Sequence, residues 1–433
     1  MNFRLGNISS LQFFQLLRFS TFLLIGVVFT KTGLGKAEIG QYETVLFVAG
    51  AVSFFWLNGL IQGLLAVSGK PDKKTAQFFN AFLLLSGLSV LAIVFLFLFG
   101  KTLSQSLLKH SGLPFQGYLS AYLFFSVPAS LVEYIYLLKN KAKNIVMYGT
   151  ISFLLMLLFV SIPAIIWESV EYSLAGLVAS AFFRYIWALV LLKKYSILKF
   201  SFPFMKEHFR LSWPLILSAL LSGSAQYIDG FIVTAYFDEA AFAVFRYGAR
   251  EFPLVLLLTN AFSTAMIPRF SEKEETGEVL QEIKNYSKKL MHWLFPLSIL
   301  LLGTTHLLFP LVFNAGFSQS ATIFNIYLLL IISRLLFPQT ILIGLRQTTI
   351  IAWASFFEII VNVSLSLWFA RLWGLPGIAF GTFAAYIFEK IFLSVMLAGK
   401  MNIPVRKYLN ISLHLSYSVL LVIVFYFVEY IIY

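Results

Sequence analysis

One carboxylate lies in the middle of an apolar stretch of the sequence. The segment SAQYIDGFIVTAYF, residues 224–237, carries Asp229 where a residue facing lipid would be expected. A charge at the centre of a membrane helix costs about 2.5–3.5 kcal/mol, so Asp229 should face protein or water. Polar residues recur on this helix at steps of three, four and seven, which predicts a stripe lining a cavity or a seam: Ser218, Ser222, Gln226, Asp229 and Tyr236.

Two arginines follow on the next helical stretch. Arg246 and Arg250 are one turn apart, and Pro253 lies one turn further on the same face, where it is a candidate hinge. Counted from the intervening turn, both arginines lie at a depth similar to that of Asp229, so an ion pair with either is sterically reasonable. Two interpretations stay open: a structural pair between neighbouring helices, or a cavity in which the arginines bind an anion and Asp229 changes its protonation.

Other ionisable residues also lie inside apolar runs. Arg18 either reaches the inner interface or, as we slightly prefer, faces a cavity, whereas Arg184 and Arg334 lie too deep to reach an interface easily. Glu133 and Glu358 are either ion-pair partners of these arginines or protonatable coupling groups. The buried charges are six cations against five acids, which leans toward an anionic ligand such as phosphate: Arg18, Arg184, Arg246, Arg250, Arg334 and Lys390, with Glu133, Asp229, Glu251, Glu358 and Glu389.

The composition identifies the kind of protein that must position these groups. Of 433 residues, 59% are hydrophobic and only 12% are charged, far from an ordinary soluble domain. Continuous apolar runs of about twenty residues, without period-two alternation, predict an all-α polytopic membrane protein. We count about thirteen spans, of which the fourth is 117–138, the seventh 211–237 and the eighth 241–268. No loop is long enough for a soluble catalytic domain, and no catalytic residues are assigned.

Several cofactor and partner classes are excluded by residue usage. The chain has no cysteine, and its five histidines lack the spacing of a shared metal site, so neither a metal nor a cofactor is expected. The net charge of +13 does not indicate nucleic acid, because the basic residues fall in alternate loops. This alternation predicts a cytoplasmic N-terminus. The loops on the side of the membrane that is rich in basic residues include Lys139, Lys141, Lys143, Lys193, Lys194, Lys199, Lys284, Lys288, Lys289, Arg406 and Lys407.

Weak internal similarity divides the chain into two copies. YSLAGLVASAFFRYI from Tyr172 matches WGLPGIAFGTFAAYI from Trp373 at an offset of 201, and IGQY at 39–42 matches VFRY at 244–247 at an offset of 205. We therefore predict two six-helix lobes, related by a pseudo-two-fold axis along the membrane normal, with a binding site at their interface. The expected boundaries are 1–200, 201–400 and an extra hydrophobic segment, 401–433, whose crossing of the membrane the sequence leaves open.

These segments together resemble a known superfamily. SWPLILSALLSGSAQYIDGFIVTAYFDEAAFAVFRYGAREFP, GLGKAEIGQYE and LWGLPGIAFGTF are similar to the multidrug/oligosaccharidyl-lipid/polysaccharide (MOP) flippases, and among them to bacterial O-antigen and capsular polysaccharide translocases. The resemblance implies a V-shaped carrier that moves a polyprenyl-diphosphate-linked oligosaccharide to the outer leaflet by alternating access. It also implies that Arg18 and Asp229 face the lumen, together with Arg246 and Arg250. A thirteenth span departs from the usual twelve or fourteen.

Three functions remain to be weighed. In the first, a flippase for lipopolysaccharide or capsule precursors, arginines hold the diphosphate, Tyr227 stacks on sugars, membrane helices accept the lipid tail, and H⁺ or Na⁺ at Asp229 or Glu358 couples transport. In the second, a cation-coupled multidrug exporter, the acids matter more than the arginines. A membrane-embedded polysaccharide polymerase or glycosyltransferase ranks last, because such proteins usually carry a large outer loop.

Overall fold

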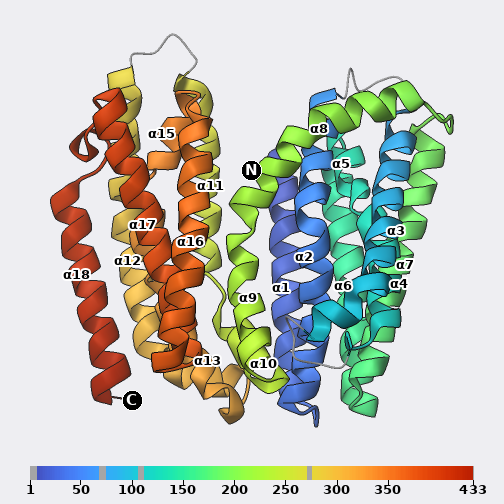
Figure 1. Cartoon of the computed structure of the whole chain (residues 1–433), viewed down its shortest axis with the longest axis horizontal. Helices are drawn as coiled ribbons and strands as arrows, with labels where there is room; N and C mark the ends of the chain where they lie inside the picture. Colours follow the sequence, from blue (N-terminus) through green and yellow to red (C-terminus); the bar gives the residue numbers. More distant parts are fainter. Residues whose placement is uncertain (1–6, 68–74, 106–111, 271–275, 433) are drawn as a thin grey trace. The chain divides into compact units, whose positions relative to one another are not determined.

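The architecture is a bundle of long membrane helices. The computed structural model describes residues 7–67, 75–105, 112–270 and 276–432. These residues are almost entirely helical and contain no strand beyond one isolated bridge between Thr75 and Ser196 (Figure 1). The predicted all-α polytopic class is therefore confirmed. Within the described residues, eleven helices are long and apolar enough to cross a membrane.

The chain divides into two compact units. Unit 1 comprises residues 1–223 and 234–243, and unit 2 comprises residues 224–233 and 244–433. Because the chain passes between the units three times, residues 224–243 contribute to both. The lobe boundaries expected from the sequence, 1–200, 201–400 and 401–433, stay predictions.

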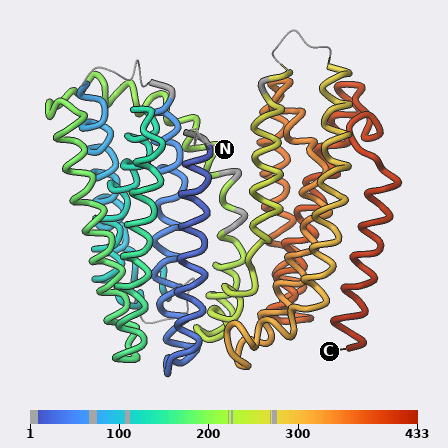
Figure 2. Tube along the Cα trace, turned by 180° about the vertical axis from the view of Figure 1, so that it is seen from behind, coloured from blue at the N-terminus to red at the C-terminus, as the bar shows by residue number. Residues whose placement is uncertain are grey.

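Unit 1 is a bundle of membrane helices. In it α1 lies against α6, and α2 against α8 (Figures 1 and 2). The predicted fourth span is broken into two helices after Pro128, which removes a backbone donor from the ladder. The helices are α1 (Asn7–Thr30), α2 (Lys36–Val67), α3 (Gln77–Leu103), α4 (Gln116–Ala129), α5 (Leu131–Leu138), α6 (Ala142–Trp167), α7 (Val170–Tyr195) and α8 (Phe202–Gly223).

The seventh and eighth predicted spans are each divided. The seventh becomes α8 and α9 (Ala225–Tyr236), which are separated at Ser224. The eighth becomes α10 (Glu239–Gly248) and α11 (Pro253–Met266), and Pro253 begins α11 instead of lying inside a helix. Proline is tolerated at a first helical position because its missing N–H has no partner there. The four residues between α10 and α11 thus form a real interruption at the place where a hinge is expected.

Unit 2 continues with long and short helices, and α18 runs beside α12 (Figure 2). The trailing segment, left open by the sequence, forms a helix with a last π-helical turn that is long enough to span. The elements are η2 (Ile267–Phe270), α12 (Thr276–Val312), η3 (Ala315–Phe317), α13 (Ser318–Leu328), α14 (Ile331–Arg334), α15 (Pro338–Gly344), α16 (Thr348–Trp373), α17 (Leu375–Met401), η4 (Val405–Lys407), α18 (Ile411–Phe427) and η5 (Val428–Ile432).

Gly176 and Gly377, which occupy matching positions in the two sequence copies, allow close packing of α6 against α7 and of α16 against α17. A Cβ on Gly176 of α7 would lie 1.9 Å from the Phe159 carbonyl oxygen of α6, and one on Gly377 of α17 would lie 2.1 Å from the Phe369 carbonyl oxygen of α16. Both distances are shorter than any van der Waals contact, so only glycine fits without a shift of the helices. These glycines are also paired in the internal sequence match.

The α18 helix is attached to unit 2 by a buried polar network. Glu429 Oε1 accepts hydrogen bonds from Asn325 Nδ2 at 2.5 Å and lies 2.8 Å from His306 Nε2. Thr305 Oγ1 donates in turn to Asn325 Oδ1 at 2.6 Å. Since side-chain hydrogen bonds hold transmembrane helices together, this network fixes the end of α18 against α12 and α13.

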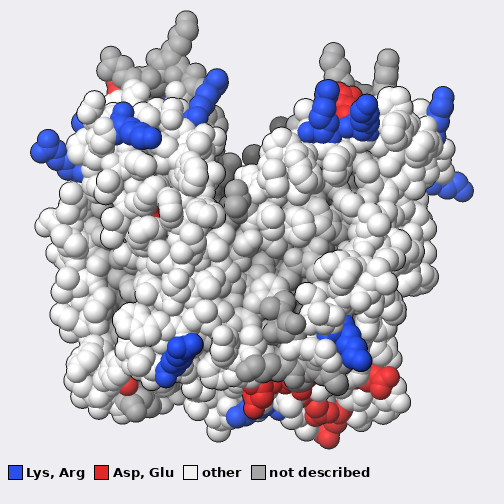
Figure 3. Space-filling view, in the orientation of Figure 1, with Lys and Arg blue, Asp and Glu red and all other residues white. Residues whose placement is uncertain are grey.

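The outer surface of the helices is apolar. Leu98, Trp293 and Leu311 are 70, 78 and 72% exposed. Figure 3 shows charged side chains at the two ends of the visible face and uncharged residues between them. This distribution suits a protein whose sides contact lipid.

Candidate functional site

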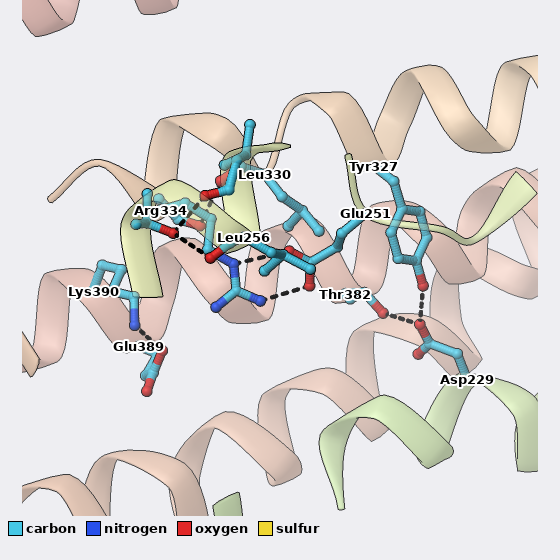
Figure 4. Close-up of polar contacts among 12 residues, drawn as sticks. Asp229, Glu251, Leu256, Tyr327, Leu330, Arg334, Thr382, Glu389 and Lys390 are labelled. Carbon is cyan, nitrogen blue, oxygen red and sulfur yellow. Dashed lines mark hydrogen bonds and ion pairs between the residues drawn. The ribbon is translucent and has the colours of Figure 1, made fainter. Parts of the chain in front are cut away.

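The Asp229 carboxylate lies at the centre of a polar cluster in unit 2. Asp229, on α9, is 4% exposed, and its Oδ2 accepts hydrogen bonds from Tyr327 Oη at 2.6 Å and Thr382 Oγ1 at 2.5 Å (Figure 4). These donors come from α13 and α17. The helix packing thus brings three separate helices to one carboxylate, which is held as an acceptor with ordered geometry.

Asn362 of α16 completes this arrangement. It is fully buried and donates from Nδ2 to Thr382 Oγ1 at 3.3 Å, and its amide also interacts with Asp229. Ser366, one turn further on α16, donates to Asn362 Oδ1 at 3.3 Å. A carboxylate, an amide oxygen and a hydroxyl are hard oxygen ligands, so the cluster has the donor chemistry for a proton or a small cation.

A second part of unit 2 contains two ion pairs. Arg334 forms a two-pronged pair with Glu251, Nε to Oε2 at 2.9 Å and Nη2 to Oε1 at 2.5 Å, and its guanidinium lies 4.6 Å from the Tyr386 ring centroid (Figure 4). Lys390 Nζ lies 2.6 Å from Glu389 Oε2, and both side chains are less than 10% exposed. From its position in the sequence we expected Lys390 to reach the cytoplasmic interface, but in the structure its charge is paired inside the bundle.

The buried side chain of Glu358 lies among these charged groups. It is 5% exposed, and within the described residues its Oε1 has no hydrogen-bond partner. Its carboxyl interacts electrostatically with Glu389, Lys390, Asp229 and Arg334. Four acids, Asp229, Glu251, Glu358 and Glu389, thus share this interior with two cations, Arg334 and Lys390. Two negative charges remain if all are ionised, and this imbalance favours the uptake of protons or cations.

Unit 1 has its own charged cluster, in which two arginines face one buried acid. Arg184 of α7 donates from Nε to Tyr148 Oη at 3.1 Å, and the Tyr148 ring packs between Phe14 and Trp187. Glu133 of α5 is 3% exposed and interacts electrostatically with Arg184 and Arg18. Its Oε2 accepts no hydrogen bond from a described residue. Two guanidinium groups therefore act on one carboxylate, so this region retains a positive charge.

The structure separates some residues that the sequence analysis considered together. Asp229 forms no ion pair with Arg246 or Arg250; Arg250 instead donates from Nε to the Arg246 carbonyl oxygen at 3.3 Å and lies over the Tyr247 ring. Both arginines are half-buried, as is Tyr227, whereas Arg18 is exposed on α1. Arg334 pairs with Glu251 and not with Glu358. The side chains of Gln226 and Ser222 lie outside the described residues.

Sequence reasoning missed the neutral partners of the buried charges. Tyr327, Thr382 and Asn362 carry no charge, and hydroxyl and amide groups are common enough in membrane helices to pass unnoticed. One signal was present: Glu358, Asn362 and Ser366 follow each other at steps of four on an otherwise apolar helix. Such a stripe faces one side of the helix and could have placed α16 beside Asp229.

Comparisons with known proteins identify the family and the fold. The family model described as "Polysaccharide biosynthesis protein" matches residues 34–322. No curated protein matches the sequence. The fold is similar to that of the lipid II flippase MurJ in an inward closed conformation, with a TM-score of 0.69 at 14% identity, covering 95% of this chain and 92% of that one.

Two further structures share the fold. One is an inward-facing multidrug resistance MATE transporter of the MOP superfamily, with a TM-score of 0.64 at 14% identity over 88% of this chain and 93% of that one. The other is a MOP transporter from Pyrococcus furiosus, with a TM-score of 0.56 at 14% identity over 91% and 93%. At such identities the likeness concerns the fold.

Proposed function

Because the chain belongs to the polysaccharide biosynthesis protein family within the MOP superfamily, we propose that it is a flippase for a polyprenyl-diphosphate-linked oligosaccharide. It would move this lipid from the inner to the outer leaflet of the bacterial cytoplasmic membrane, with its N-terminus in the cytoplasm. The observation that carries the proposal is the polysaccharide family match on a chain whose fold resembles a lipid flippase along 95% of its length.

The arginines are assigned to the diphosphate. A guanidinium group suits phosphate oxygens because it presents several donors in one plane. Arg18 is exposed, Arg246 and Arg250 are half-buried, and Arg18 and Arg184 together leave unit 1 with a positive charge beside Glu133. Arg334 is assigned a structural role instead, because its guanidinium group is already paired with the Glu251 carboxylate. Gln226 and Tyr227 would contact the sugars.

The acid-rich interior of unit 2 is assigned to coupling. A coupling ion changes the balance of two conformations only if it binds one of them more tightly. Asp229 receives donors from α13 and α17, so a proton or Na⁺ that replaced these contacts would favour one packing of the three helices over another. Glu358 is the second coupling group of unit 2, and Glu133 would play the corresponding part in unit 1.

Export of surface polysaccharide tests the flippase proposal. In a strain that depends on this gene, Arg18→Ala and Arg250→Ala should reduce surface glycan while protein abundance stays normal, and lysine at either position should rescue only partly. Arg371→Ala, which removes an exposed arginine at the end of α16, is the control. Normal export in both alanine variants would remove these arginines from the substrate site.

A cation-coupled drug exporter is the second candidate, favoured by the excess of acids in unit 2 and the MATE-like fold. Binding of a lipophilic cation that is abolished by Asp229→Asn, but unaffected by Arg18→Ala and Arg250→Ala, would support the exporter over the flippase.

A further inference from the structure

A basic pocket lies at one end of unit 2, away from the Asp229 cluster. It has a volume of about 720 Å³ and is enclosed by the start of α12, the end of α15, the end of α17 and η4. Three cations line it, Lys284, Arg406 and Lys407, together with apolar side chains that include Leu280 and Leu345. Over unit 2, Figure 3 shows basic side chains at the end where α12 begins and α17 ends.

Backbone carbonyls hold the two lysines of this pocket. Lys284 Nζ donates to the Arg406 carbonyl oxygen at 2.8 Å, and Lys407 Nζ donates to the Asn402 carbonyl oxygen at 3.4 Å. In the part of the chain that the structure describes, neither lysine nor Arg406 forms an ion pair with a carboxylate.

The acids of α12 lie on its other face. Gly277, Leu280 and Lys284 line the pocket at helical spacing, whereas Glu278 and Glu282 are rotated by roughly half a turn. Glu282 is also engaged by Arg269. The folding of α12 therefore gathers positive charge on the pocket side and places its carboxylates elsewhere.

The position of the pocket indicates an amphiphilic ligand. The α17 span ends at Met401 and the α18 span begins at Ile411, so the pocket residues of η4 lie where these helices leave the membrane. Leu280, Leu345, Met401 and Ile403 give it an apolar wall beside the three cations. A free phosphate ion would use only the cations, whereas the headgroup and glycerol region of a phospholipid would use both.

We propose that this pocket binds the phosphate headgroup of an anionic phospholipid of the surrounding membrane. Basic pockets between helices at a membrane interface recognise such headgroups through charge and hydrogen bonding. The proposal goes beyond the flippase function and does not depend on it, because the bound lipid is a fixed component of unit 2 and not the transported molecule.

Native mass spectrometry of the purified full-length protein tests this site, with phosphatidylglycerol and phosphatidylcholine as probes. Phosphatidylglycerol should bind more tightly than phosphatidylcholine, and K284Q/R406Q/K407Q should abolish the difference. One cation near an anionic lipid contributes about 1 kcal/mol, so each substitution should weaken phosphatidylglycerol binding about fivefold. R406Q alone leaves both lysine contacts in place. It should weaken phosphatidylglycerol binding about fivefold even if the triple variant fails to fold.

A charge-matched control separates this pocket from general attraction to anionic lipid. K193Q/K194Q/K199Q also removes three cations, none of which lines the pocket, and should leave the tightest phosphatidylglycerol binding unchanged. An equal loss in the control and pocket variants would overturn the proposal, as would equal affinity for the two lipids in the wild type. Displacement of the lipid by millimolar diphosphate would assign the site to a soluble phosphate compound instead.

Discussion

The substitution Asp229→Asn should remove the response to the coupling ion while leaving the fold intact. Asn retains a side-chain oxygen that can accept from Tyr327 and Thr382, so the geometry of the two hydrogen bonds can persist. Replacing a charged acceptor by a neutral one weakens each bond by about 1 kcal/mol, about 2 kcal/mol in all. Removal of a carboxylate that is 4% exposed offsets this loss, because burying a charge costs several kcal/mol.

The ion response itself has a calculable size. A cation at a hundred times its dissociation constant stabilises the state that binds it by about 2.7 kcal/mol. This corresponds to a rise of roughly 5 °C in the melting temperature of a large domain. The wild type should therefore melt at a higher temperature either in Na⁺ than in choline at equal ionic strength, or at acidic than at neutral pH. Asp229→Asn should lose that rise.

Thermal unfolding of the purified protein in detergent is the assay, and Glu207→Gln, which neutralises an exposed carboxylate on α8, is the control. The control should keep the full response. An Asp229→Asn protein that still responds to the same ion by the same number of degrees would show that the coupling site lies elsewhere. A wild type that responds to neither ion would refute the reasoning from the acid-rich interior.

Three further substitutions follow from the contacts. Arg334→Met should destabilise unit 2 by about 3 kcal/mol, because it leaves Glu251 buried and unpaired, and Arg334→Met with Glu251→Met should recover much of this loss in the same melting assay. Thr382→Val should lower stability by about 1–3 kcal/mol and weaken the ion response, whereas Thr382→Ser should restore both. Gly176→Ala should cost about 1–3 kcal/mol by forcing α6 and α7 apart; Gly303→Ala, with open space around it, should be neutral or stabilising, and equal effects would contradict the packing argument.

The helical class and most spans could be predicted from sequence because hydrophobic length is a local property. The interruptions were harder to predict. Pro253 marks one of them, and the sequence indicated a hinge there, but the break at Ser224 carries no proline. The paired glycines Gly176 and Gly377 were visible as a repeat, whereas the carbonyl that each one contacts became visible only in three dimensions.

Most of the buried charges were found from sequence, although Arg18 is exposed, but their partners were not found. Depth along a helix placed Asp229 near Arg246 and Arg250, yet depth does not report the direction in which a side chain points. In the structure Asp229 Oδ2 accepts hydrogen bonds from Tyr327 and Thr382 instead. Arg334 similarly pairs with Glu251, more than eighty residues away, because the helix packing, and not the sequence distance, decides which charges meet.

The attachment of Glu429 has a practical consequence for handling this protein. A deletion that removes Glu429, or an affinity tag inserted beside it, acts directly on a buried anchor. The Asn325 amide and the His306 ring would each lose this carboxylate as a partner. The end of α18 would then separate from its neighbours, so purification handles are better placed away from this segment.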